Sequence, residues 1–246
     1  MDLDLKGKNA IVTGGTRGIG RAIAELLAAE GCNVALCARH EAAVDETVAA
    51  LRSQGVKSWG SRIDVAETEA LRAWVEEATA ALGGLDIFVA NVSALAQSMD
   101  DDSWRRSLAI DIMGTVAGIE AAIPLLEQSK AGAIVVVGTT GAIEIAGPPR
   151  PYASAKAALA PYVKALARNL APKNIRANMV SPGNVYFKGG VWNVVEEANP
   201  ELFRTMVGRN PMGRMGTPAE VANAVVFSPA RAPALSPAPI SLSTAR

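Results

Sequence analysis

Two ionisable side chains, Tyr152 and Lys156, are the first candidates for chemistry in this sequence because they stand four residues apart. Their segment reads YASAK, and its alanines favour a helix on which this spacing places both side chains on one face. An ammonium group beside a phenol lowers the phenol's pKa from its reference value of about 10. Such a tyrosine can exchange a proton with a carbonyl or hydroxyl oxygen as a general acid or base. The spacing is common, however, and two exposed side chains on a surface helix are the alternative interpretation.

The second candidate is the glycine-rich stretch from Thr13 to Gly20, which reads TGGTRGIG. It follows a short apolar run and precedes apolar residues at helical spacing, so it joins a strand to a helix N-terminus. Glycines let the main chain approach a ligand, and the N–H groups and dipole of a helix N-terminus favour a phosphate. We therefore expect the pyrophosphate of a dinucleotide at this turn. Close packing of a helix on a strand also requires small residues, so the glycines alone do not establish the site.

The elements that must position these candidates alternate along the chain. Strands are predicted at 10–12, 34–38, 56–63, 85–90, 133–137 and 175–180. Helices are predicted at 19–30, 44–55, 71–82, 102–127 and 152–170. Strands that alternate with helices of this length form a parallel sheet with helices on both faces. The expected fold is a doubly wound, Rossmann-like α/β domain of three layers, with ligands at the carboxyl ends of the strands.

The composition restricts the classes of function. The chain has 246 residues, of which 50% are hydrophobic, and its formal net charge is zero. A large core can therefore be buried, and the lack of a basic cluster argues against a nucleic-acid partner. The sequence starts without a signal-like segment, and its unbroken apolar runs are too short for a membrane span. We expect a cytoplasmic protein with no membrane partner, in which Cys32 and Cys37 are free buried thiols.

The composition changes abruptly at Ser228. The segment from there to Arg246 contains prolines at positions 229, 233, 237 and 239, which exclude a helix and disfavour a central strand. We therefore expect one domain over residues 1–227 and an atypical tail rich in Pro, Ala and Ser over residues 228–246. An altered reading frame near Ser228 and a genuinely divergent tail are both explanations of this change.

Four motifs in a fixed order carry a resemblance to a known family. TGGTRGIG follows the first predicted strand, ANVS (90–93) the fourth, YASAK the fifth and SPG (181–183) the sixth. Over residues 5–227 this order resembles the classical short-chain dehydrogenase/reductase (SDR) family, and residues 213–227 match its late helix. The resemblance implies an NAD(P)-dependent oxidoreductase that acts on a C=O or CH–OH group, forms a homodimer or homotetramer and needs no metal.

The resemblance also implies the site residues. The catalytic residues would be Tyr152, Lys156, Thr139 and Asp111. The cofactor contacts would be Gly14, Thr16, Arg17, Gly18, Ile19, Gly20, Arg39, Asp64, Val65, Asn91, Tyr152, Lys156, Pro182 and Val185.

Several positions depart from the family pattern. Thr139 replaces the family's catalytic serine and keeps a hydroxyl, whereas Asp111 replaces an asparagine and lacks the amide donors. Phe187 stands where the family often has a threonine that bonds the nicotinamide carboxamide. The family's last strand, which ends in VDGG and commonly joins subunits, has no counterpart after Phe227. The oligomeric state is therefore left open, and so is the role of Asp111 in proton transfer.

The cofactor and the substrate are encoded to different degrees. The second predicted strand ends at Ala38 and Arg39 rather than at an acidic residue, and Arg17 lies in the glycine turn, so a 2′-phosphate and hence NADP(H) is favoured over NAD(H). Residues 185–206 should form a loop and a short helix over the pocket, with an apolar lining that consists of Phe187, Trp192, Phe203 and Met206. Arg150 and Lys188 offer instead a grip for a carboxylate or phosphate.

Two functions of different class follow from these expectations. The first is hydride transfer between NADP(H) and a small to medium carbonyl or alcohol substrate, such as a ketone, a sugar or polyol, or a 3-oxoacyl compound. In this function Tyr152 is the general acid or base, Thr139 orients the carbonyl and Lys156 holds the ribose. The alternative is a catalytically weak dinucleotide sensor or scaffold, which is motivated by Asp111, Phe187 and the tail.

Overall fold

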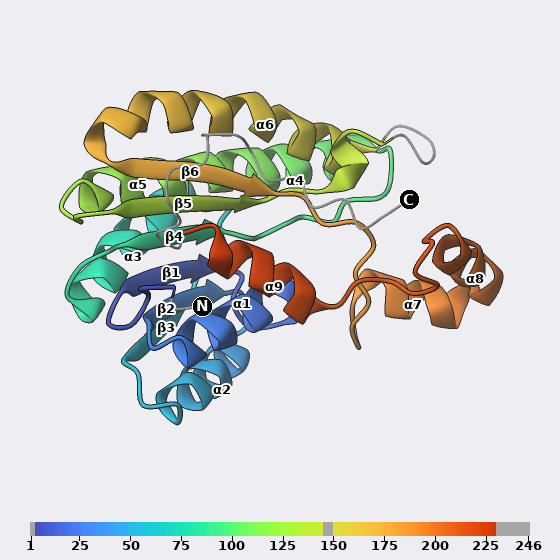
Figure 1. The fold of residues 1–246 in the computed structure, drawn as a ribbon. Coiled ribbons are helices and arrows are strands. Elements are labelled where there is room, and N and C mark those ends of the chain that lie inside the picture. Colours follow the sequence, from blue (N-terminus) through green and yellow to red (C-terminus); the bar gives the residue numbers. More distant parts are fainter. Residues whose placement is uncertain (1–2, 145–149, 230–246) are drawn as a thin grey trace.

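In the part of the chain that the structure describes, six short segments form the strands of one parallel sheet, and all but the third are largely apolar (Figure 1). The computed structural model describes residues 3–144 and 150–229. The strands are β1 (Asn9–Thr13), β2 (Asn33–Ala38), β3 (Ser58–Arg62), β4 (Ile87–Ala90), β5 (Gly132–Val137) and β6 (Ile175–Val180). Their order is β3-β2-β1-β4-β5-β6, and all neighbouring strands are parallel. The expected doubly wound, Rossmann-like fold is confirmed, and the strand order reverses between β1 and β4.

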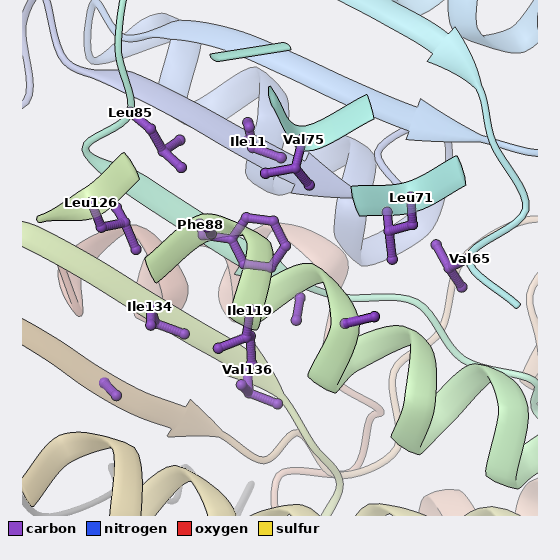
Figure 2. Packing of buried hydrophobic residues seen from close by; sticks show 14 of the residues in the cluster. Ile11, Val65, Leu71, Val75, Leu85, Phe88, Ile119, Leu126, Ile134 and Val136 are labelled. Atoms are coloured by element: carbon purple, nitrogen blue, oxygen red, sulfur yellow. The ribbon is translucent and has the colours of Figure 1, made fainter. Parts of the chain in front are cut away.

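Helices cover both faces of the sheet (Figure 1). One face carries α3 (Thr68–Leu82), α5 (Thr115–Leu126) and α6 (Pro151–Leu170), and the other carries α1 (Gly18–Ala29), α2 (Glu41–Arg52) and α9 (Pro218–Phe227). Each face has its own hydrophobic core. Figure 2 shows the first core, in which Phe88 of β4 lies among Ile11, Val75 and Ile119. Burial of one such phenylalanine side chain stabilises the fold by about 2 kcal/mol, so β4 is firmly held in the sheet.

The helix predicted over residues 102–127 is present, but it is not α-helical throughout. It consists of α4 (Asp101–Ser107), a π-helical segment η1 (Leu108–Gly114) and α5. A π segment is wider than an α turn and often occurs at a functional site, and here it contains the fully buried Asp111. By length and composition Asp101–Leu126 could cross a membrane, but one face of it, which includes Ile110, Ile119 and Leu126, packs in the first core.

The segment after β6 differs from its prediction as a loop and one short helix. It forms two helices, α7 (Val191–Ala198) and α8 (Pro200–Gly208), which lie to one side of the sheet in Figure 1. Asn199 explains the division, because its side chain accepts a hydrogen bond from the Leu202 N–H (3.0 Å) and caps α8. Pro200 at the first position of α8 reinforces this start.

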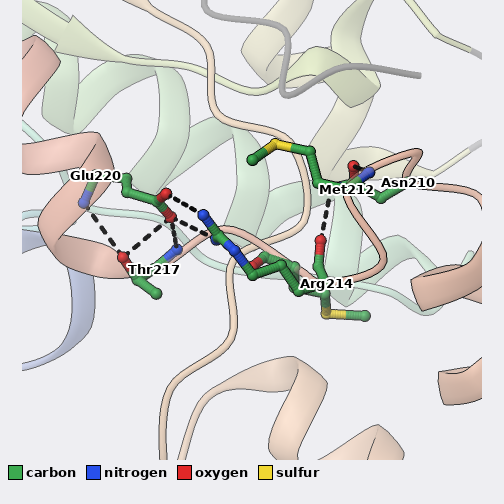
Figure 3. A network of polar contacts seen from close by, with 6 residues as sticks. Asn210, Met212, Arg214, Thr217 and Glu220 are labelled. Carbon is green, nitrogen blue, oxygen red and sulfur yellow. Dashed lines mark hydrogen bonds and ion pairs between the residues drawn. The ribbon is translucent and has the colours of Figure 1, made fainter.

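The start of α9 is fixed by a polar network around Glu220 (Figure 3). The Thr217 hydroxyl accepts from the Glu220 N–H (3.3 Å), and the Glu220 carboxylate accepts from the Thr217 N–H (2.8 Å), which completes a capping box. Arg214 donates two further hydrogen bonds to the same carboxylate, at 2.6 and 2.9 Å. The late helix therefore begins at Pro218, five residues after the start of the matched segment at Gly213.

Two further expectations concern the cysteines and the tail. Cys32 and Cys37 are buried free thiols, as predicted, and burial raises the pKa of each to about 12. Such thiols are unreactive at neutral pH. Of the predicted tail, only Ser228 and Pro229 fall within the described residues, and residues 230–246 lie outside them.

Candidate active site

Asn91 fastens the glycine turn to the end of β4. Its side-chain amide donates to the main-chain oxygens of Thr13 (3.2 Å) and Gly14 (3.1 Å). Its main-chain N–H donates to the Thr13 hydroxyl (3.1 Å). The family resemblance implies a cofactor contact for Asn91, whereas in the structure its amide shapes the turn on which a cofactor would lie.

The glycine turn forms a cradle at the start of α1. Gly14 has a φ of +67°, a conformation that favours glycine. A Cβ on Gly20 would lie only 2.1 Å from the main-chain oxygen of Gly14, so no larger residue fits there. The N-cap residue of α1, Arg17, makes no side-chain capping bond, which leaves the first N–H groups of the helix for a phosphate. The cradle thus fits a dinucleotide pyrophosphate, and the turn also contains the expected contacts Thr16, Gly18 and Ile19.

The loop after β6 lies against this turn. The ring of Phe187 packs closely on two glycines, since a Cβ would come within 2.5 Å of it on Gly18 and within 2.8 Å on Gly190. Arg17 also donates from Nη1 to the main-chain oxygen of Gly189 (3.4 Å). The sequence departure at Phe187 therefore has a steric effect in addition to the loss of a hydroxyl, because the ring occupies space beside the N-terminus of α1.

Pro182 and Val185 begin the same loop at the carboxyl end of β6. The main-chain oxygen of Pro182 accepts from the Thr140 N–H (2.9 Å), which joins this loop to the end of β5. Val185 is buried and forms an isolated parallel bridge with Gly216. The structure thus brings both predicted residues to the edge of the sheet that carries the glycine turn.

Lys156 lies beneath this edge and is almost completely buried, with 2% of its surface exposed. Its ammonium group donates to the main-chain oxygens of Val92 (3.0 Å) and Val137 (3.1 Å), which follow β4 and end β5. Oδ1 of Asp111 lies 3.7 Å from Nζ and forms an ion pair with it, beyond hydrogen-bond distance. Burial lowers the pKa of Lys156, and the negative charge of Asp111 opposes that change.

Asp111 is fully buried in the π segment. Its Oδ1 accepts from the Ala94 N–H (3.3 Å), whereas its Oδ2 has no hydrogen-bond partner among the described residues. Burial raises the pKa of Asp111, and the Lys156 ammonium opposes this effect. The position predicted as a substitute for the family's asparagine therefore holds one half of a buried ion pair.

Tyr152 and Thr139 complete the group. Thr139 follows β5 in an extended conformation, and its Oγ1 accepts a hydrogen bond from the Gly141 N–H (3.1 Å). Tyr152 stands in the first turn of α6, where burial raises the pKa of its phenol, a hydrogen bond with Thr139 lowers it, and the charge of Asp111 raises it further. The sequence predicted a lowered pKa for Tyr152. That expectation is wrong for this structure, because burial of the phenol is the largest effect on its pKa and raises it.

A second group lies at the carboxyl ends of β2 and β3. Arg39 follows β2 and is exposed, while Val65 is buried beyond β3. Asp64 is exposed and accepts from the Ala66 N–H (3.1 Å). The sequence reasoning overlooked Arg62, the last residue of β3, which donates from Nε to the main-chain oxygen of Arg39 (3.3 Å). Only the register of the two strands, which pairs Ala38 with Arg62, reveals this proximity.

The chain is similar in sequence and in fold to known proteins. Residues 14–228 match a family described as enoyl-(acyl carrier protein) reductase. The chain is 37% identical over 227 residues to isoepoxydon dehydrogenase from Penicillium expansum. This alignment covers 91% of this chain and 88% of the dehydrogenase. The fold is also similar to that of a 3-oxoacyl (acyl-carrier-protein) reductase from Agrobacterium tumefaciens C58, whose structure was solved with NADP bound. The superposition has a TM-score of 0.90 at 28% sequence identity and covers 100% of this chain and 96% of the reductase chain. The structure of a xylitol dehydrogenase with bound NAD⁺ superposes with a TM-score of 0.90 at 25% sequence identity. This superposition covers 98% of this chain and 99% of the dehydrogenase chain.

The family match and these relatives show an oxidoreductase that uses a nicotinamide dinucleotide, and the observed fold agrees with this class. The chain belongs to the classical short-chain dehydrogenase/reductase family. It therefore catalyses hydride transfer between the dinucleotide and a carbonyl or alcohol substrate.

Proposed function

We propose that this enzyme reduces a ketone of small to medium size with NADPH, and that Tyr152 donates the proton. The observation that carries the proposal is the grouping of Tyr152 with the Thr139 hydroxyl and, one helical turn further along α6, with the buried ammonium of Lys156. The raised pKa of Tyr152 agrees with a phenol that is protonated before it reacts. A protonated phenol suits an acid that delivers a proton to the oxygen of a carbonyl group. The nicotinamide, when bound, supplies the hydride.

The other residues of the group have supporting tasks in this proposal. The Thr139 hydroxyl, whose oxygen already accepts from Gly141, keeps its hydrogen for donation to a neighbouring oxygen. Lys156 provides a buried positive charge one helical turn after Tyr152, and its third N–H, which has no hydrogen bond in the described part of the chain, would contact the cofactor ribose. Asp111 favours the charged form of Lys156. The four residues then act as an acid, a donor that orients the carbonyl, a cation and its counterion.

The proposed preference for NADPH rests on cations at the ribose end of the cradle. Arg17 and Arg39 are exposed, and neither forms an ion pair with an acidic side chain in residues 3–144 or 150–229. A guanidinium group suits a phosphate by charge and by geometry. We further propose, from the sequence expectations, a cytoplasmic homo-oligomer with its catalytic domain in residues 1–227.

The helices α7 and α8, which the sequence analysis expects over the pocket, favour a substrate with an apolar body. Tyr186 and Phe203 make an edge-to-face ring contact with 5.7 Å between centroids, and neither helix has a fully buried residue. Arg150, which precedes α6 and hydrogen-bonds Gln97, lies two residues before Tyr152 and is exposed. The alternative is a substrate with an acidic group, which the positive charge of Arg150 would bind.

A Tyr152→Phe variant tests the proposal. NADPH oxidation is followed with ketones, aldehydes and 3-oxoacyl thioesters, and NADPH affinity is measured separately by fluorescence. We expect turnover to fall by at least about a hundred-fold, because the general acid is deleted, while the affinity stays unchanged. Tyr162→Phe, on the same helix and half-buried, is the matched control and should keep full activity.

The second candidate function is a dinucleotide sensor with little turnover. It is favoured by the Phe187 ring, which lies beside the N-terminus of α1, and by the deep burial of Lys156. The same assay separates the two functions. A wild-type protein that binds NADPH tightly but oxidises it with no member of the panel would be a sensor.

A further inference from the structure

We propose that Arg62 is a third cation of the cofactor site and contacts the 2′-phosphate that distinguishes NADPH from NADH. This inference rests on the proposed preference for NADPH, and it adds Arg62 to the residues that would produce that preference. It is carried by three observations: the strand register, a side-chain tether and an uncompensated cluster of charge.

The register places Arg62 beside the end of β2. Ala38 pairs with Arg62 in the parallel ladder, and the Ile63 N–H donates to the main-chain oxygen of Ala38 (2.9 Å). Arg39 follows Ala38 directly, so the two arginines start from neighbouring positions on adjacent strands. Among the residues that the structure describes, β3 is an edge strand of the sheet (Figure 1).

The tether orients the guanidinium group of Arg62. Its Nε donates to the main-chain oxygen of Arg39 (3.3 Å), which leaves Nη1 and Nη2 without a hydrogen-bond acceptor in the described part of the chain. The side chain is exposed at the carboxyl edge of the sheet. A guanidinium held at Nε with a free pair of Nη groups can form two parallel hydrogen bonds to a phosphate.

The charges around Arg62 are not compensated. Arg17, Arg39 and Arg62 belong to the turn after β1, the turn after β2 and the end of β3, and these three strands are neighbours in the sheet. The main-chain N–H of Gly14 donates to the Cys37 oxygen (2.8 Å), which holds the first two turns together. None of the three arginines forms an ion pair with an acidic side chain of residues 3–144 or 150–229.

This row of three cations fits an anion better than it fits the uncharged ribose hydroxyls of NADH. In nucleotide-binding sheets, ligands lie outside the carboxyl ends of the strands, and an arginine in this region accommodates the 2′-phosphate. The cradle for the pyrophosphate lies on β1, so an adenosine that extends from it toward β2 and β3 brings its 2′-phosphate to this row.

The experiment compares two arginines that are tethered in the same way at opposite ends of β3. Arg62→Gln removes the proposed contact. Arg52→Gln is the matched control, because Arg52 is also exposed and its Nε also donates to a main-chain oxygen, that of Ser58 (3.0 Å). Dissociation constants for NADPH and NADH are measured for each protein by fluorescence titration.

We expect Arg62→Gln to weaken NADPH binding about ten-fold, as befits one charge-assisted contact at a solvated site. NADH binding should change by less than about two-fold, and Arg52→Gln should change neither constant, because an isolated exposed charge contributes little. Arg62→Lys, which keeps the charge but not the tether, should retain most of the NADPH affinity.

Each other result overturns the inference in a recognisable way. If wild-type protein prefers NADPH and Arg62→Gln leaves that preference unchanged, the role of Arg62 is wrong and the proposed cofactor stands. Equal weakening of NADPH and NADH would show that Arg62 only supports the turn at Arg39. A wild-type protein that binds both cofactors equally would overturn the NADPH preference together with the role of Arg62.

Discussion

Oδ1 of Asp111 lies 3.7 Å from Nζ of Lys156, and both side chains are withdrawn from solvent. Each charge is costly to bury, and each reduces the cost of the other. The ammonium has two further acceptors on the main chain, at Val92 and Val137, while the second carboxylate oxygen has none among the described residues. The carboxylate is therefore the less satisfied partner of the pair.

Asp111→Asn should leave turnover at neutral pH equal to or above that of wild type, because it supplies amide donors without a change in volume. The loss of the negative charge removes an effect that raises the pKa of both Tyr152 and Lys156. Both pKa values should fall, so the alkaline limb of the kcat/KM profile for reduction should move to lower pH. A large loss of kcat at neutral pH would instead show that the carboxylate takes part in proton transfer.

Lys156→Met should reduce both cofactor affinity and rate, and it should also destabilise the fold. It leaves the Asp111 carboxylate buried without its partner, which costs about 3 kcal/mol. In the double variant with Asp111→Asn, part of this stability should return, because no charge is left unpaired. Urea unfolding of the two single variants and the double variant measures the coupling. Stabilities that simply add would mean that the pair does not interact energetically.

The sequence could predict the sheet and the ends of its strands, since these depend on apolar runs and alternation that are visible residue by residue. It could not predict the π segment. In a short apolar stretch, a change from α to π geometry around Asp111 produces no distinct spacing of apolar residues. The sequence also could not predict whether the pKa of Tyr152 is raised or lowered. That direction depends mainly on how deeply the phenol is buried, which is a property of the folded chain.

Arg62 shows a second limit of the sequence reasoning. The motif comparison identified Arg39 because a known pattern ends at that position, whereas Arg62 belongs to no motif. Its proximity to Arg39 follows from the pairing of β2 with β3, which is a property of the sheet. The division into α7 and α8 was missed although the sequence carries a signal for it, because Asn199 followed by Pro200 is typical of a helix start.

Gly20→Ala should abolish tight dinucleotide binding and destabilise the protein. The added Cβ would lie 2.1 Å from the main-chain oxygen of Gly14 and 2.4 Å from the Asn91 amide, and neither can move without opening the cradle. We expect a loss of about 3 kcal/mol, the upper part of the range for overpacking. Gly208→Ala is the control, since a Cβ there meets nothing within 4 Å. Calorimetric binding and chemical unfolding check both effects, and a Gly20→Ala protein that binds NADPH normally would contradict the cradle.

Glu220→Gln should lower the melting temperature at neutral pH and lose this effect in acid. Arg214 first, and then the Thr217 N–H, lower the pKa of Glu220 from 4.5 to about 2. The ionised form is thus favoured in the folded state, and its contribution is present above pH 4.5 and disappears as the pH falls toward 2. The difference from wild type should shrink over that interval. Glu201→Gln, in the first turn of α8 and without an ion pair in the described structure, should show no such pH dependence.

The hydrogen bonds of Asn91 also bear on how the protein folds. They join residues 77 and 78 positions apart in the sequence, so the glycine turn acquires its final shape only after β4 has paired with β1. Contacts of such separation form late, because the long intervening loop must first be closed. During refolding, helical signal should therefore recover before the capacity to bind a dinucleotide. A cofactor present from the start cannot act as a template for the nucleus, and it stabilises only the finished chain.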